Sequence, residues 1–347
     1  MSAVEWTIER LDDKVGSEAV LDAVGKSLPG NEVTRKTDHY WQWKHLHNPF
    51  GVSTGTLGVG VSAGDVVGVR SFMRWTLDDP SHAVGRQRHA VRAVDTVTAD
   101  AWRGKGVFKR LTLAAIDALA NDEVDIVFNT PNQNSAPGYL KMGWQCVGDV
   151  PLYVRPLRPF RLALHVLQAR LGGRAEGGAQ LSALPRWESS PELMALVQSH
   201  ERARAGAGLR TPRSAAYLSW RYGAHPQADY RVLVDGPASA PTGLAVLRAN
   251  RRLGADELVL VELWAQDARA DYLASVLRRV LAVDGFDHVM AHFKVGSVEH
   301  AALRRALFFK LPQRKMRLFA RALGRPLPAD VFSFDGWDLS LGDLELF

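Results

Sequence analysis

The stretch AWRGKGVFKRL, residues 101–111, sets two glycines among basic residues where one sequence pattern gives way to another. Before it, residues 90–99 alternate apolar and polar side chains, which predicts a strand. After it, residues 107–120 repeat apolar side chains at helical spacing. Backbone N–H groups at the start of a helix have no internal acceptor, and glycine lets the chain approach an anion closely. The stretch therefore predicts either an ordinary strand-to-helix turn or a loop that binds phosphate groups.

The elements expected around this loop alternate between strands and helices. In chain order they are a helix over 15–28, a hairpin of two strands joined at 63–65, a strand over 90–99, a helix over 107–120, a strand over 125–130, a short helix over 135–144 and a final strand over 146–157. This order predicts an α/β fold of the layered α+β kind, with a mixed sheet flanked by helices.

A repeat links the two halves of the chain. Residues 40–49 read YWQWKHLHNP and residues 217–226 read YLSWRYGAHP, so the pattern Tyr-x-x-Trp-basic-x-x-x-x-Pro recurs at an offset of 177 residues. Where the first copy has its glycine loop, the second reads QDARADYLASVL at 266–277, without glycine and with acidic residues. Because the aromatic pair survives in the copy that lacks the loop, we expect Tyr40 and Trp43 to serve packing.

The repeat predicts two tandem copies of one domain. We expect a first domain over 1–155, an amphipathic helix and linker over 156–190, and a degenerate second domain over 191–347. The second domain should bind no phosphate at the position of the loop, because acidic side chains repel an anion there.

The composition excludes several classes of protein. The 347 residues carry a net charge of +6, which suits an anionic partner such as a nucleic acid, a phosphorylated cofactor or an acidic membrane surface. The basic residues are spread over predicted helices and form no nucleic-acid motif, so we expect no specific nucleic acid. The single cysteine, Cys146, excludes an internal disulfide, and no pattern of metal ligands is present. No apolar run is long enough for a membrane helix and the N-terminus lacks a signal-peptide pattern, so we expect no membrane insertion and a cytoplasmic location.

Two segments of the first copy resemble the GNAT superfamily of acetyl-CoA-dependent N-acetyltransferases. Residues 103–108, RGKGVF, are similar to the family's pyrophosphate loop, [QR]-x-x-G-x-[GA]. Residues 132–144, NQNSAPGYLKMGW, are similar to the family's N-x-x-A-x-x-x-Y-x-x-x-G-F. The resemblance covers about residues 35–155 and departs from the pattern at Phe108 and Ser135. It implies a GNAT-like fold in two tandem copies, of which the second is degenerate.

The resemblance also implies a reaction and a set of site residues. Acetyl-CoA would be the acyl donor, and a small molecule with a primary amine the acceptor, with a nucleotide-linked amino sugar as the favoured class. Tyr139 stands where the family places the acid that protonates the departing thiolate, and Asp95 lies on the strand where a base is often found. A homodimer is left open. The residues implied to bind the cofactor are Val97, Arg103, Gly104, Lys105, Gly106, Val107, Phe108, Asn132 and Ser135.

Each of these residues also has a purely structural interpretation. Tyr139 could be a half-buried helix tyrosine, Asn132 a neighbour of a helix cap, and Asp95 a structural or substrate-binding carboxylate. His39 and His89 are weaker candidates for the base. Two other functions stay open: a tRNA-dependent aminoacyltransferase of the tandem-GNAT type, against which the phosphate loop argues, and an acyl-CoA-binding sensor without catalysis.

Overall fold

In the computed structural model, described residues are 5–27, 37–61, 65–79, 86–158, 181–204, 206, 208–252, 254–312, 316–324, 326–328 and 330–344. The first half contains β1 (Trp6–Arg10), α1 (Glu18–Ser27), α2 (Asp38–His45), β2 (Thr54–Gly60), β3 (Val66–Asp79), β4 (Arg86–Thr98), α3 (Val107–Asn121), β5 (Ile126–Asn129), α4 (Ala136–Lys141), β6 (Gln145–Asp149) and β7 (Tyr153–Pro156). The second contains β8 (Ser182–Ala183), α6 (Pro191–Ala203), α7 (Ala215–Leu218), β9 (Tyr230–Asp235), β10 (Gly243–Arg252), β11 (Ala255–Ala265), α8 (Ala270–Leu281), β12 (His288–Ala291), α9 (Val298–Arg305), β13 (Phe309–Lys310), β14 (Arg317–Ala322) and α10 (Leu341–Leu344).

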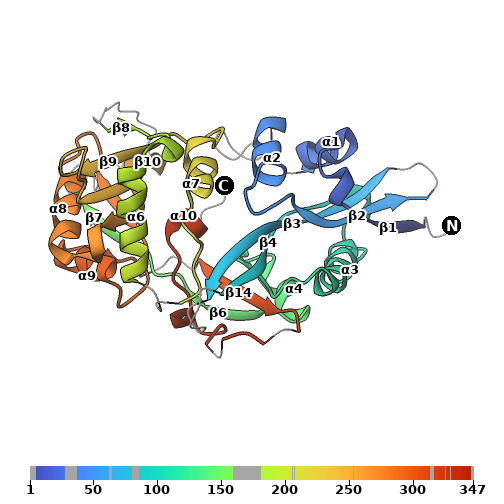
Figure 1. Cartoon of the computed structure of the whole chain (residues 1–347). Coiled ribbons are helices and arrows are strands. Elements are labelled where there is room, and N and C mark those ends of the chain that lie inside the picture. Colours follow the sequence, from blue (N-terminus) through green and yellow to red (C-terminus); the bar gives the residue numbers. More distant parts are fainter. Residues whose placement is uncertain are drawn as a thin grey trace.

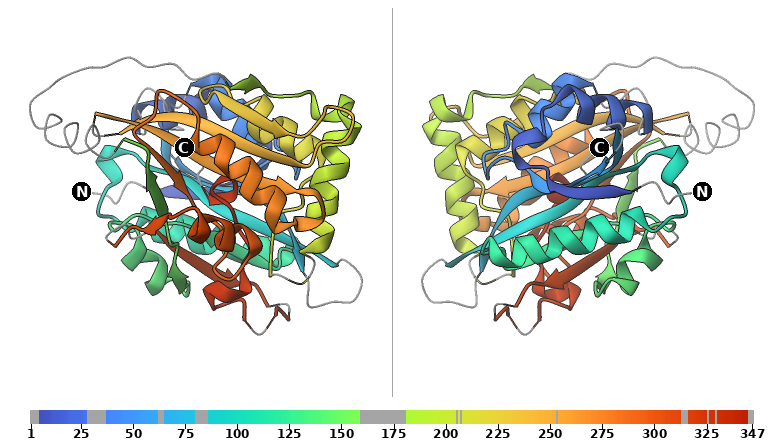
Figure 2. Two further views of the ribbon diagram at one scale, coloured as in Figure 1. Left: turned by 90° about the vertical axis from the view of Figure 1, so that its left-hand side faces the viewer. Right: turned by 90° about the vertical axis from the view of Figure 1, so that its right-hand side faces the viewer.

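These strands form two seven-stranded mixed sheets. Sheet A has the order β1-β2-β3-β4-β5-β14-β6, and sheet B has the order β13-β7-β12-β11-β10-β9-β8. In sheet A only β4 and β5 pair in parallel, and in sheet B only β11 and β12 do, among the described strands. Helices α1 and α2 lie on one face of sheet A, and α3 and α4 on the other (Figure 1). Figure 2 shows the long α3 running across that second face.

The two sheets exchange their equivalent strands. β14, from the end of the chain, lies between β5 and β6 in sheet A, whereas β7 lies between β12 and β13 in sheet B. Figure 1 shows β14, near the red end of the colour scale, beside the green β6. Each sheet is therefore completed by the other half of the chain, and the hydrogen-bonded sheets cross the expected boundary at residue 155.

The prediction of a single final strand over 146–157 is wrong. The segment forms two strands, β6 and β7, which pair in different sheets. Pro151 lies between them and cannot donate a ladder hydrogen bond, which favours a break there. The first helix begins at Glu18, after a 3-10 turn over Asp12–Lys14, and not at residue 15. Most of the helix and linker expected over 156–190 lies outside the described residues.

The repeated aromatic motif joins the two halves. Trp43 Nε1 donates to the Trp220 carbonyl oxygen at 2.8 Å, and Trp220 Nε1 donates to the Trp43 carbonyl oxygen at 2.8 Å. Their rings stack with centroids 5.0 Å apart and planes 14° apart. Both belong to a buried apolar cluster that takes residues from both sheets. The reciprocal bonds agree with the expected packing role of the Tyr-x-x-Trp pattern.

Candidate active site

The glycine loop takes a backbone conformation that glycine favours. Gly104 and Gly106 have φ angles of +73° and +75°, in the left-handed region that other residues rarely adopt. A Cβ atom added at either position would meet nothing within 4 Å, so the loop faces open space. The sequence therefore needs glycine here for the turn of the chain, and the same turn leaves the backbone approachable from outside.

This loop leads into the N-terminus of α3 without a side-chain cap. Gly106 is the N-cap residue and has no side chain that could accept from the first turn. The first amide N–H groups of the helix, from Val107 onward, have no intrahelical acceptor, and the helix dipole adds partial positive charge there. Arg103 and Lys105 are exposed beside them. The arrangement is suited to an anion.

A cavity of about 700 Å³ opens beside the loop. β4 and β5 pair only from Ala90 to Arg92 on β4, so the two strands diverge beyond that point. The cavity occupies this divergence and the space up to α4. Its lining residues are Ala93, Val94, Asp95, Thr96, Thr98, Phe108, Asn129, Thr130, Pro131, Asn132, Asn134, Ser135, Gly138 and Tyr139.

Asn132 and Ser135, which the sequence predicts to bind the cofactor, lie in the turn that precedes α4. Asn132 Oδ1 accepts hydrogen bonds from the backbone N–H groups of Asn134 and Ser135, both at 3.0 Å, and from the Ser135 hydroxyl at 3.1 Å. Asn132 thus organises the turn before the helix, as in its structural interpretation, while both residues also line the cavity. Asn129 is 5% exposed, and its Oδ1 has no hydrogen-bond partner among the described residues. That oxygen can accept from a ligand.

Tyr139 lies where α4 meets the cavity. Its side chain is 5% exposed and contacts Phe108 and Trp144 edge to face, with centroids 5.7 and 5.1 Å apart. The ring is thus fixed by packing. Because Tyr139 also lines the cavity, the structure places this predicted residue together with Asp95, Phe108, Asn132 and Ser135.

Asp95 lines the cavity and is also part of a buried polar chain. Its Oδ2 atom lies 2.7 Å from Lys44 Nζ and 3.0 Å from His45 Nε2. His45 Nδ1 lies 2.8 Å from the Ser53 hydroxyl. With the carboxylate accepting from Nε2–H, a neutral His45 accepts the serine proton at Nδ1. Sequence reasoning missed Lys44 and His45, although both follow the Tyr-x-x-Trp motif directly.

Solved structures share this architecture over most of the chain. A GCN5-related N-acetyltransferase from Anabaena variabilis ATCC 29413 gives a TM-score of 0.58 at 13% identity, over 92% of this chain and 73% of that one. A GCN5-related N-acetyltransferase from Kribbella flavida gives 0.55 at 16% identity, over 91% and 72%. A conserved protein of unknown function from Enterococcus faecalis V583 gives 0.60 at 12% identity, over 92% and 72%. The chain has the GNAT fold. No known family model matches its sequence, and no curated protein does.

The expected GNAT fold class is confirmed, and the two mixed sheets correspond to two GNAT-like halves. The second GNAT half lacks the features of the first at the loop. Asp267 and Ala268 take positive φ angles of +52° without being glycine, and the Asp267 N–H donates to Ser199 Oγ at 2.8 Å. A separate pocket in the second half, between β11 and the segment around Ser340, has a volume of only about 10 Å³.

The second GNAT half keeps a carboxylate at the position of Asp95. Glu262 on β11 accepts a hydrogen bond from the Tyr222 hydroxyl at 2.6 Å, and Tyr222 is the repeat equivalent of His45. Arg213 pairs with both Glu262 and Asp343, at 2.9 and 2.8 Å. Burial, together with the nearby Asp343 carboxylate, raises the pKa of Glu262 to about 7, against the opposing effect of Arg213. In both halves, a carboxylate on the strand before the loop position is therefore bound by a side chain that follows the Tyr-x-x-Trp motif.

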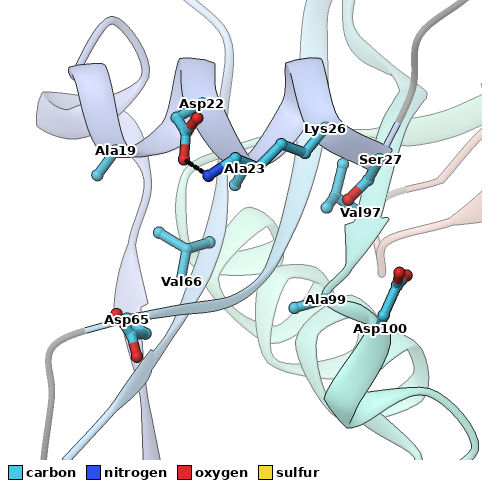
Figure 3. A pocket seen from close by; sticks show the side chains of 10 residues that line it. All are labelled: Ala19, Asp22, Ala23, Lys26, Ser27, Asp65, Val66, Val97, Ala99 and Asp100. Atoms are coloured by element: carbon cyan, nitrogen blue, oxygen red, sulfur yellow. Dashed lines mark hydrogen bonds and ion pairs between the residues drawn. The ribbon is translucent and has the colours of Figure 1, made fainter.

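The remaining predicted residues lie apart from the cavity or at its edge. Val97 is 2% exposed and packs under α1, where it lines a second, smaller pocket of about 410 Å³ (Figure 3). Its neighbours Thr96 and Thr98 line the main cavity instead. His39 and His89 are exposed and line neither pocket. The smaller pocket carries Asp22 and Lys26, which pair with each other at 2.6 Å.

Two general properties bear on the class of site. No helix among the described segments is long and apolar enough to cross a membrane. The described residues also contain no cluster of three or more His, Cys, Asp or Glu side chains that could hold a metal ion.

Proposed function

We propose that the chain transfers an acyl group from a CoA thioester, with acetyl-CoA as the simplest donor, to the primary amine of a small molecule. The observation that carries this proposal is the continuity of the first half's cavity. It extends from Phe108, in the first turn of α3, along β4 and β5 to Tyr139, and the glycine loop directly precedes that first turn.

The residues present fit a CoA thioester in three respects. The backbone amides of 103–108 can bind the pyrophosphate, and Arg103 and Lys105 add positive charge. The backbone N–H and C=O groups on the diverging edges of β4 and β5 can form hydrogen bonds with the extended, amide-containing arm of CoA. The buried Asn129 Oδ1 supplies an acceptor for one of its N–H donors.

In the proposed reaction the amine nitrogen attacks the thioester carbonyl carbon and the carbon–sulfur bond breaks. Tyr139 gives its phenolic proton to the departing sulfur, and Asp95 accepts the proton that the amine nitrogen loses, directly or through water. Solvent then returns a proton to Tyr139 and removes one from Asp95. Holding both partners in one cavity supplies the rest of the rate by positioning.

For the acceptor, we propose a small amine and place nucleotide-linked amino sugars first, on the resemblance of the sequence to proteins that modify surface polysaccharides. For the second half, we propose a role in shaping the acceptor side without a second CoA. The uncapped α3 terminus favours a pyrophosphate-bearing donor over charged tRNA.

The test is release of free CoA thiol from acetyl-CoA in the presence of amino sugars, amino acids and polyamines, with product mass measured in parallel. Amine-dependent thiol release with an acylated product is the expected result. Binding of acetyl-CoA without turnover on any amine would support a sensor instead, and no binding would overturn the proposal.

A further inference from the structure

A buried arginine, Arg70, lies next to two side chains that line the main cavity, Phe108 and Tyr139. Arg70, on β3, is fully buried, and its guanidinium stacks on Phe72 with its carbon 4.4 Å from the ring centroid. The same carbon lies 5.8 Å from the centroid of Phe108 and 5.5 Å from that of Tyr139. Phe108 and Tyr139 both line the cavity, so Arg70 faces the side of sheet A where the acyl donor is proposed to bind.

Only one edge of this guanidinium is used by the protein. Nη1 donates to the Val94 carbonyl oxygen at 3.0 Å and to the Thr96 hydroxyl. Within the part of the chain that the structure describes, Nε and Nη2 have no hydrogen-bond partner and no carboxylate pairs with Arg70. Nε–H and Nη2–H lie on the same edge of the planar group, which is a fork that binds a carboxylate through two parallel hydrogen bonds. A buried cation with unused donors is unfavourable unless a ligand supplies the acceptor.

The second half shows that the fold does not need this polar cluster. Arg70 is paired with Thr96 across β3 and β4, and the equivalent pair across β10 and β11 is Ala245 with Leu263. The repeat aligns Tyr139 with Leu303. Ala245, Leu263 and Leu303 all belong to one buried apolar cluster. The half without a glycine loop therefore has hydrocarbon at the three positions where the first half has arginine, threonine and tyrosine.

We infer that Arg70 binds the terminal carboxylate of the acyl group, so that the cleft selects a CoA thioester of a dicarboxylic acid. This inference rests on the proposed function and names its donor more closely. A carboxylate supplies both acceptors and the negative charge that the fork lacks, whereas an acetyl methyl group supplies neither. Phe108 is only partly buried, and the inference requires its ring to move aside so that the acyl end can reach Arg70.

The inference is tested by calorimetric titration of the full chain with CoA, acetyl-CoA, malonyl-CoA and succinyl-CoA. Hydrogen bonds to a charged group favour the carboxylated donor by about tenfold to hundredfold over acetyl-CoA. Arg70→Met should bring that ratio to about one while the affinity for CoA itself is retained. Arg70→Lys keeps the charge without the fork and should give an intermediate ratio. The matched control is Lys105→Met, which should weaken all four ligands equally and leave the ratio unchanged.

Thermal unfolding of the same variants separates this role from a structural one. Arg70→Met should keep or raise the melting temperature, since it replaces a buried unpartnered charge by hydrocarbon. A lower melting temperature with an unchanged ligand ratio would mean that Arg70 only holds β4. Equal affinity of the unaltered chain for acetyl-CoA and both carboxylated donors would overturn the inference alone. Absence of binding to every CoA compound would overturn the proposed function with it.

Discussion

Substitution of Gly106 tests whether the loop before α3 binds phosphate. The residue has φ +75° and ψ 10°, so any side chain there carries a backbone cost of about 1–2 kcal/mol. The Cβ itself meets no neighbour within 4 Å. An aspartate at this N-cap position also interacts favourably with the helix dipole, which offsets part of the strain. Gly106→Asp should therefore fold, with a loss of stability near 1 kcal/mol.

The effect on binding should be much larger than the effect on stability. A carboxylate about 4 Å from a phosphate costs about 1 kcal/mol in water and about 4 kcal/mol near a protein surface, which corresponds to roughly fivefold to a thousandfold in affinity. Gly106→Asn is the matched control, because asparagine has the same shape and tolerates the left-handed conformation without adding charge. Calorimetry with acetyl-CoA should rank Gly, Asn and Asp in falling affinity. Equal affinity of the folded Asn and Asp variants would refute the argument.

Three further substitutions address the proposed acid and the two strand carboxylates. Tyr139→Phe should lower turnover by roughly 10²–10⁴-fold at neutral pH, keep acetyl-CoA affinity and recover partly at high pH; full activity with chemistry rate-limiting would remove Tyr139 from the mechanism. Asp95→Asn leaves Lys44, which is 3% exposed, without its carboxylate, and should lower the free energy of unfolding by about 3–5 kcal/mol in a denaturant titration; unchanged stability would contradict the buried pair. Because burial raises the folded-state pKa of Glu262 to about 7, the stability that this group contributes is present below pH 4.5 and is lost as the pH rises through 7. Glu262→Gln should flatten that limb of stability against pH, and an identical limb in the variant would assign it to another group.

The local elements could be predicted from the sequence because their signals are local. The glycine loop lies between an alternating run and a helical run, and the structure places β4 before it and α3 after it. The repeat could be found because Tyr-x-x-Trp sits at the contact between the halves, where Trp43 and Trp220 bond to each other.

The parts that could not be predicted depend on contacts between distant residues. The sequence pattern over 153–156 predicts an extended strand. It does not predict that this strand, β7, pairs in sheet B, or that β14 takes the equivalent place in sheet A. Arg70 lies in a predicted strand of the first hairpin, and only the fold shows that its side chain is buried beside Thr96 and Tyr139. Asp95 was found from its strand, but its contacts with Lys44 and His45 come from a helix about 50 residues earlier.

A crystal structure of the chain with bound CoA tests the central claim most directly. The account predicts one CoA per chain, with its pyrophosphate on the backbone amides of Gly104 to Phe108 and its thiol end between β4 and β5 near Tyr139. CoA bound between β11 and β12 in the second half, or bound in the first half away from the glycine loop, would contradict it.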